Sequence, residues 1–226
     1  MTKPSLNSSL SVLSLALLGV LPGGTVQAQQ QQQPGQPASA ASPKAATAPA
    51  AKPYVWITGS ERFKWFMMST VGPTSLLGAG PLSAGWGTLF NSPPEYGPGW
   101  EGFGKRYGMR LTGVSTGNAI EALTGAALHE DPRYIPAPPG TSFGKRVGRI
   151  IGHTFLAYRP DGTTRFSYSR VAGNVGNNFL SNLWRVESEN SAGDAALRCV
   201  WGLTGRMGGN AFAELWPSVA KKLKRK

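Results

Sequence analysis

Phe143-Gly-Lys-Arg-Val-Gly-Arg-Ile-Ile-Gly-His-Thr-Phe-Leu-Ala-Tyr158 is the stretch that decides the fold, because its side chains sort onto two opposite faces of a helix. At about 100° per residue, the apolar and basic positions separate. The apolar face comprises Phe143, Val147, Ile150, Ile151, Thr154 and Tyr158, and the basic face comprises Lys145, Arg146, Arg149 and His153. We therefore predict a helix over residues 143–158, which Thr141 or Ser142 can cap.

This helix permits two interpretations. A basic amphipathic helix would lie on an anionic membrane surface, with Lys145, Arg146 and Arg149 at the headgroups. An ordinary core helix would bury its apolar face and leave its basic face in water, and we favour this arrangement for the helix itself. Gly144, Gly148 and Gly152 recur at intervals of four residues, which predicts one stripe where another backbone packs closely.

Further helices are expected over residues 100–129, 167–185 and 194–215. Pro132 closes the first of them, and Pro217 ends or kinks the last. A turn over residues 159–163 leads into a short extended piece over 164–166. We therefore predict a single mainly α domain of four to five short, closely packed helices.

The positions of asparagine and glycine indicate that these residues lie at contacts between the helices. Asn174 and Asn178 lie one turn apart, and the dipeptide Gly-Asn begins at positions 117, 173 and 209. Both residue types are poor helix formers, so their recurrence indicates close helix contacts with amides that hydrogen-bond across them. A polar groove that binds a ligand is the alternative, but no other chemistry converges on it.

Residues 65–94 contain no charged side chain. The stretch is long enough to span a membrane, but its glycines and prolines argue against a regular helix. We expect a buried or interfacial hairpin here. An integral membrane protein built around a hairpin at residues 65–90 is the alternative.

The N-terminal residues are typical of export. A short apolar run over residues 10–21 precedes Val26-Gln27-Ala28, which predicts a signal peptide over residues 1–28 that is cleaved after Ala28. Residues 29–53 are rich in Gln, Pro and Ala and predict a disordered linker. The helical domain should then occupy residues 54–226. The expected location is the periplasm or the outer membrane.

The chain carries a net charge of +12. Nucleic acid is a poor partner for an exported protein, so we expect an anionic lipid or an acidic envelope polymer, while any protein partner is unknown. The candidate contacts are Lys145, Arg146 and Arg149 together with the tail residues Lys221, Lys222, Lys224, Arg225 and Lys226. A solvated tail with no partner is the alternative for that end.

Few residues point to catalysis. His129, Asp131 and His153 are weak catalytic candidates, because His129-Glu-Asp lacks the second histidine of an HExxH zinc motif. No nucleophile elbow and no phosphate-binding loop are present. The single cysteine, Cys199, is expected to be a packed thiol. We predict no metal and no cofactor.

Three segments resemble a family of exported bacterial proteins with no assigned activity: Glu101-Gly-Phe-Gly-Lys-Arg-Tyr-Gly108, Glu130-Asp-Pro-Arg-Tyr134 and Phe166-Ser-Tyr-Ser169 with the Gly-Asn helix after it. The resemblance implies no catalytic residue and no cofactor. The leading hypothesis is a non-enzymatic envelope protein that associates with a membrane or another anionic surface, and it rests on the basic helix over residues 143–158, the basic tail and the seven tryptophans. An envelope hydrolase or metal-dependent enzyme that uses His129 and His153 is the alternative.

Overall fold

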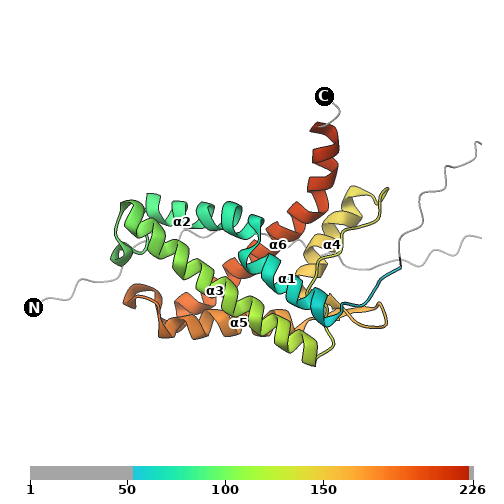
Figure 1. Ribbon diagram of the computed structural model, residues 1–226, viewed down its shortest axis with the longest axis horizontal. Coiled ribbons are helices and arrows are strands. Elements are labelled where there is room, and N and C mark those ends of the chain that lie inside the picture. Colours follow the sequence, from blue (N-terminus) through green and yellow to red (C-terminus); the bar gives the residue numbers. More distant parts are fainter. Residues whose placement is uncertain (1–52, 224–226) are drawn as a thin grey trace, which may run out of the picture. The chain divides into compact units, whose positions relative to one another are not determined.

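Helices account for most of residues 53–223, which are the residues described by the computed structural model (Figure 1). The predicted mainly α fold is confirmed. The α-helices are α1 Gly59–Val71, α2 Gly80–Leu89, α3 Gly99–Ala127, α4 Phe143–Phe155, α5 Tyr168–Leu180 and α6 Ala192–Leu223. Between them lie the π-helix η1 Thr74–Ala79, the 3₁₀ turns η2 Pro94–Tyr96, η3 Ser181–Leu183 and η4 Glu187–Glu189, and the antiparallel strands β1 Leu156–Tyr158 and β2 Thr164–Phe166. The predicted signal peptide, the linker up to residue 52 and residues 224–226 lie outside the described residues.

Residues 59–89 run along α3 instead of folding back on themselves. Both α1 and α2 pack against α3, and Figure 1 shows one following the other along it. The α-helical ladder stops at Gly72, which is extended, and the π-helix η1 then carries the chain into α2. The predicted hairpin over residues 65–90 is therefore wrong. Within residues 53–223, no helix combines the length and the apolar character needed to cross a membrane.

The closest approach between α3 and α5 occurs where two glycines meet. A Cβ built on Gly173 would lie 2.8 Å from the carbonyl oxygen of Gly117, so no larger residue fits without a shift. Nearby, Asn174 donates a hydrogen bond of 2.9 Å to the carbonyl of Cys199 in α6, and Asn178 donates one of 2.8 Å to the carbonyl of Asn174. The prediction of close helix contacts joined by amides is confirmed at this dipeptide.

Strand β1 replaces the last turn predicted for the helix over residues 143–158. The helix α4 ends at Phe155, because Leu156 adopts an extended conformation and pairs with Phe166 of β2. The tight turn between the strands is closed by a hydrogen bond of 2.8 Å from the Arg159 amide to the Thr163 carbonyl. The extended piece predicted over residues 164–166 is confirmed.

Most of the basic face of α4 contacts the interior, so the expectation that this face lies in water is wrong for Arg146, Arg149 and His153, while Lys145 is exposed. His153 is buried, and Arg146 and Arg149 are half-buried. Arg146 forms an ion pair of 3.7 Å with Glu214 of α6, and Arg149 donates to the carbonyl of Ile135 at 2.8 Å. Glu214 comes from a helix far away in the sequence and Ile135 from the loop before α4, so the periodicity of α4 alone does not reveal these acceptors.

The apolar face of α4 is divided, because Ile150 and Thr154 are buried whereas Phe143 and Ile151 are exposed. Phe143 is 69% exposed and Ile151 is 47% exposed. A Cβ built on Gly144 or Gly148 would meet no described atom within 4 Å. A Cβ built on Gly152 would meet only the side chain of Leu156, which directly follows α4, at 3.8 Å. The predicted close packing along these glycines is therefore wrong, because no described element covers this side of α4.

The last two α-helices differ from prediction at their C-terminal ends. Helix α5 ends at Leu180, and η3 continues the chain to Leu183. Helix α6 passes through Pro217 and ends at Leu223, beyond the predicted end at residue 215. A proline inside a helix removes one backbone hydrogen bond and favours a bend. Figure 1 shows such a bend in the last part of α6.

Candidate functional site

The interior of the described chain is mostly polar. Glu121, Glu130 and Asp131 are among its most deeply buried side chains, each at most 1% exposed, and Glu214 is 3% exposed. Burying a carboxylate is unfavourable unless cations and hydrogen-bond donors surround it. The partners of these four carboxylates therefore define the architecture of the interior.

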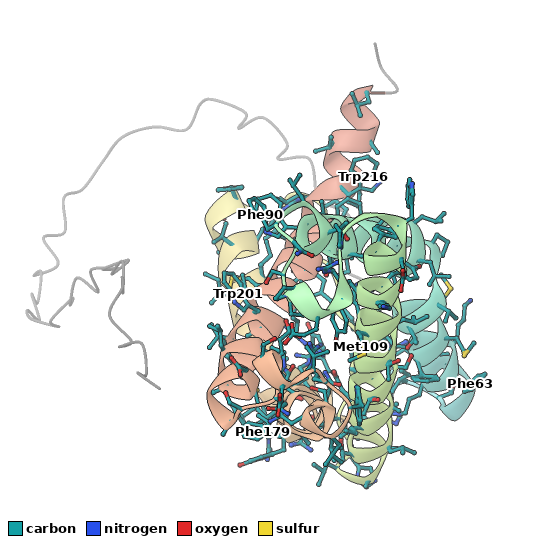
Figure 2. All side chains as sticks on the ribbon, turned by 90° about the vertical axis from the view of Figure 1, so that its left-hand side faces the viewer. Phe63, Phe90, Met109, Phe179, Trp201 and Trp216 are labelled. Carbon is teal, nitrogen blue, oxygen red and sulfur yellow. The ribbon has the colours of Figure 1, made fainter. Side chains whose placement is uncertain are left out.

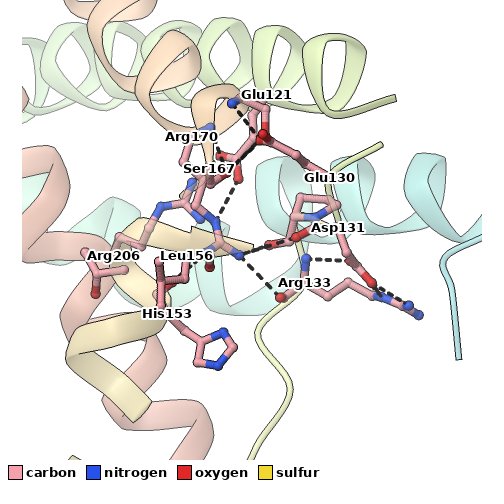
Figure 3. A network of polar contacts seen from close by, with 12 residues as sticks. Glu121, Glu130, Asp131, Arg133, His153, Leu156, Ser167, Arg170 and Arg206 are labelled. Atoms are coloured by element: carbon pink, nitrogen blue, oxygen red, sulfur yellow. Dashed lines mark hydrogen bonds and ion pairs between the residues drawn. The ribbon is translucent and has the colours of Figure 1, made fainter. Parts of the chain in front are cut away.

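Glu130 caps helix α5 from a distant loop (Figure 3). Its carboxylate accepts hydrogen bonds from the Ser167 hydroxyl at 2.9 Å, from the Ser169 hydroxyl at 2.6 Å, and from the backbone amides of Tyr168 and Ser169. Arg159 lies 3.1 Å from the same carboxylate. Burial raises the pKa of Glu130, but the hydrogen bonds outweigh it and hold the pKa below its ordinary value. The charge also lies at the positive end of the helix dipole.

Asp131 joins the first described residues to the loop after α3. Its carboxylate accepts hydrogen bonds from the Tyr54 hydroxyl at 2.8 Å and from the Arg133 guanidinium at 2.7 Å. Arg133 also donates to the carbonyl of Val55 at 2.9 Å. Burial, together with the hydrogen bond to Asp131, raises the pKa of Tyr54. The predicted catalytic candidate Asp131 is thus fully occupied by these partners.

Arg170 lies at the centre of the network and is 3% exposed. Its guanidinium donates to the carbonyls of His153, at 2.6 Å, and of Leu156. It lies 3.5 Å from Glu121 of α3, which forms a second ion pair with Arg206 of α6. Burial lowers the pKa of Arg170 to about 10, assisted by the charge of Arg206. One carboxylate therefore holds α3, α5 and α6 together.

Glu214 ties α6 to the loop before α4. Its carboxylate accepts hydrogen bonds from the Tyr134 hydroxyl at 2.8 Å and from the Ala137 amide at 2.9 Å. Its other oxygen faces Arg146 of α4. Burial and the hydrogen bond to Glu214 raise the pKa of Tyr134.

His153 is buried between two tyrosine rings, with ring centroids 5.9 Å from Tyr134 and 5.0 Å from Tyr158. Its Nδ1 atom is buried and has no hydrogen-bond partner among the described residues. Burial lowers its pKa to about 4, and the nearby charges of Arg149 and Arg170 add to this effect. The ring is therefore neutral near pH 7.

The two histidines take part in different contacts. His129 is an exposed residue after α3 with a φ of 54°, and its carbonyl accepts a hydrogen bond of 3.5 Å from Arg159. His153 lies in α4, and no contact joins the two side chains among the described residues. Within residues 53–223, no group of three or more His, Cys, Asp or Glu residues is arranged to hold a metal ion.

The predicted surface-binding residues are divided between several environments. Lys145 is exposed on α4, whereas Arg146 and Arg149 contact the interior. Lys221 and Lys222 belong to the last turn of α6. Residues 224–226 lie beyond the described part of the chain.

Apolar side chains form exposed stripes on the outside of the same helices. At helical spacing they follow one another on α1, α2, α4, α5 and α6, and Figure 2 shows Phe63, Phe179, Trp201 and Trp216 at the periphery. The stripes are Phe63, Met67 and Val71; Leu82, Trp86, Leu89 and Phe90; Phe143, Ile151 and Phe155; Val171, Val175 and Phe179; and, along α6, Leu197, Val200, Trp201, Phe212, Trp216, Val219 and Leu223. Soluble monomers rarely expose large contiguous apolar patches.

The fold and the site together define a small α-helical bundle with an ionic interior and an apolar exterior. No protein family model, no curated protein and no solved structure matches the chain.

Sequence reasoning missed most of the network. The sequence does not indicate Arg170, Arg206 and Glu214 as buried, because a charged residue inside a helical pattern is usually expected to face water. One signal was present: the segments 130–134 and 166–169, which carry the family resemblance, meet through the contacts of Glu130 with Ser167 and Ser169.

Proposed function

We propose that this chain is a non-enzymatic, exported envelope protein that associates with an anionic membrane surface through its exposed apolar stripes. The observation that supports the proposal is the reversal of the usual distribution, with carboxylates and arginines inside and aromatic and aliphatic side chains outside. Helices in lipid follow this rule, since small and polar residues pack them together while apolar residues face the acyl chains.

Helix α4 provides the clearest case. Its arginines and its histidine contact the interior together with Ile150, while Phe143, Ile151 and Phe155 are exposed. In water the exposure of these three side chains is unfavourable, because burying apolar surface contributes about 25 cal/mol per Å². An acyl-chain environment removes this penalty. The stripe on α4 is therefore the proposed contact with lipid.

The net charge of +12 supports an anionic surface over a neutral one. Basic residues near a membrane are each attracted to anionic lipid by about 1 kcal/mol, and salt screens this attraction. Trp86, Trp100 and Trp201 are exposed, and tryptophan is favoured at the boundary between lipid and water. An acidic envelope polymer would satisfy the charge but leave the apolar stripes uncovered.

Co-sedimentation of the purified chain with vesicles tests the proposal. Binding should be strong to vesicles that contain phosphatidylglycerol and should weaken at high salt. The triple variant Phe143→Ser, Ile151→Ser, Phe155→Ser should bind vesicles at least roughly tenfold more weakly than the wild type, because three apolar side chains no longer enter the lipid. The matched control Phe143→Leu, Ile151→Leu, Phe155→Leu keeps the stripe apolar and should bind like the wild type.

Three outcomes would contradict the proposal. The first is a stable oligomer that ignores vesicles, which would mean that a second copy covers the stripes. The second is binding to an acidic polysaccharide with none to vesicles. The third is vesicle binding that the serine variant retains in full, which would leave charge as the only contact.

A further inference from the structure

A cavity of about 270 Å³ lies where α2, α3 and α5 meet the segment after α5. It is separate from the network around Glu130 and Arg170. Three arginines contribute to its lining, Arg106 and Arg110 from α3 and Arg185 from the segment after η3. Glu189 of η4 is the carboxylate among its lining residues. The cavity is therefore strongly cationic.

The charges of this cavity do not balance. Arg185 forms an ion pair of 2.5 Å with Glu189. The guanidinium of Arg106 donates to the backbone carbonyls of Ser92, Pro93 and Gly97, which are dipoles and not countercharges. Two positive charges, those of Arg106 and Arg110, therefore have no carboxylate at ion-pair distance among the described residues.

Arg110 has the fewest partners of the three. It makes one long hydrogen bond, 3.4 Å, to the Ser75 hydroxyl. Burial lowers its pKa, which means that the protein disfavours the charge it must carry there. Arg110 is half-buried. A partly desolvated, poorly paired guanidinium is unfavourable, and an anion with several acceptor oxygens would relieve this.

A second polar group of the cavity also lacks a partner. The side-chain oxygen of Asn177 in α5 is buried and accepts no hydrogen bond from any described residue. The same amide lies beside Gly113 of α3, 3.5 Å from where a Cβ would stand. A hydroxyl or amide donor on a ligand would pair with this oxygen.

We propose that this cavity binds the phosphate group of a phosphate ester that also carries hydroxyl groups. A phosphate presents acceptor oxygens in several directions, which suits guanidinium groups arriving from different sides. A phosphate monoester carries close to two negative charges and a diester carries one, against the two unbalanced arginines. A hydroxyl close to the phosphate reaches Asn177.

Two sources provide this chemistry. One is a soluble phosphate ester, and the other is the headgroup of a phospholipid such as phosphatidylglycerol. On α2, Ser83 and Gly87 line the cavity, and the exposed stripe of Leu82, Trp86 and Phe90 begins one position away. Acyl chains would therefore lie on α2 when the headgroup enters the cavity. This lipid form rests on the proposed membrane association, whereas the phosphate site itself does not.

Calorimetric titration of the full chain tests the site without a membrane. The probes are glycerol 3-phosphate and dihexanoyl phosphatidylglycerol kept below its micelle concentration. At least one of them should bind the wild type, and Arg110→Met should weaken that binding roughly tenfold or more, as expected for loss of a charge-assisted hydrogen bond. The control Arg165→Met removes the same charge from an exposed strand and should bind like the wild type.

The pattern of binding identifies the source. Binding of glycerol 3-phosphate indicates a soluble ester, whereas binding of the short-chain lipid alone indicates a headgroup. Each bound probe should also raise the melting temperature of the wild type and not that of Arg110→Met, which separates a binding defect from misfolding. The site is refuted if neither probe binds the wild type, or if Arg110→Met and Arg165→Met bind equally well. Vesicle binding by the serine variant of α4 is a separate measurement, so the proposed membrane association and the proposed phosphate site can each fail independently.

Discussion

The carboxylate of Glu130 accepts one hydrogen bond of 2.6 Å from the Ser169 hydroxyl and another of 2.8 Å from the Ser169 backbone amide. This pair fixes the start of α5 against the loop that follows α3. The arrangement is a helix cap supplied from elsewhere in the chain, and it leaves the Glu130 charge satisfied without access to water.

Replacing this carboxylate should be strongly destabilising. We expect Glu130→Gln to lower the free energy of unfolding by about 3 kcal/mol, because the new NH₂ group faces donors and Arg159 loses its ion-pair partner. Urea unfolding followed by circular dichroism measures this. The control Glu101→Gln removes an exposed carboxylate paired with Lys105 and should leave the stability essentially unchanged. Equal effects of the two substitutions would argue against a buried network.

His153 should make the stability depend on pH. Burial lowers its pKa from 6.5 to about 4, so the unfolded chain binds a proton at a higher pH than the folded chain. The stabilisation of the folded state by neutral His153 is therefore fully present above pH 6.5 and is lost as the pH falls toward 4. We expect the free energy of unfolding of the wild type to fall by about 1 to 2 kcal/mol between pH 7 and pH 5 because of this residue.

The matched variants are His153→Gln and His129→Gln. His153→Gln should flatten the pH dependence between pH 7 and pH 5, whatever its effect on stability at pH 7. His129→Gln should keep the slope, because that side chain is exposed. Urea unfolding at several pH values provides the comparison, and a slope that survives in His153→Gln would assign it to another group.

Two glycine substitutions should act in opposite directions. Gly173→Ala places a Cβ 2.8 Å from the Gly117 carbonyl and should destabilise the contact between α3 and α5 by about 1 to 3 kcal/mol. Gly148→Ala meets open space on α4 and should stabilise the chain by about 1 kcal/mol or less, through helix propensity. Thermal melts of both variants check this. Destabilisation by Gly148→Ala would mean that another surface covers α4.

Much of the secondary structure was predictable, because caps, prolines and turn residues act locally. Pro132, the turn after Arg159 and the packing of Gly173 against another helix were all indicated by the sequence. The orientation of α4 was not. Its periodicity separates two faces but does not say which one faces inward. The structure buries part of each face, Ile150 and Thr154 from one and His153 from the other, and Glu214 of the distant helix α6 pairs with Arg146 beside them.

Tryptophan fluorescence in vesicles tests the central claim most directly. We expect Trp86, Trp201 and Trp216, which are exposed, to contact lipid. Mixing the chain with phosphatidylglycerol vesicles should shift the emission to shorter wavelength, and bromine atoms on the acyl chains should quench it. Emission that neither shifts nor is quenched by brominated vesicles, under conditions where the chain is folded, would contradict the claim that the apolar exterior faces lipid.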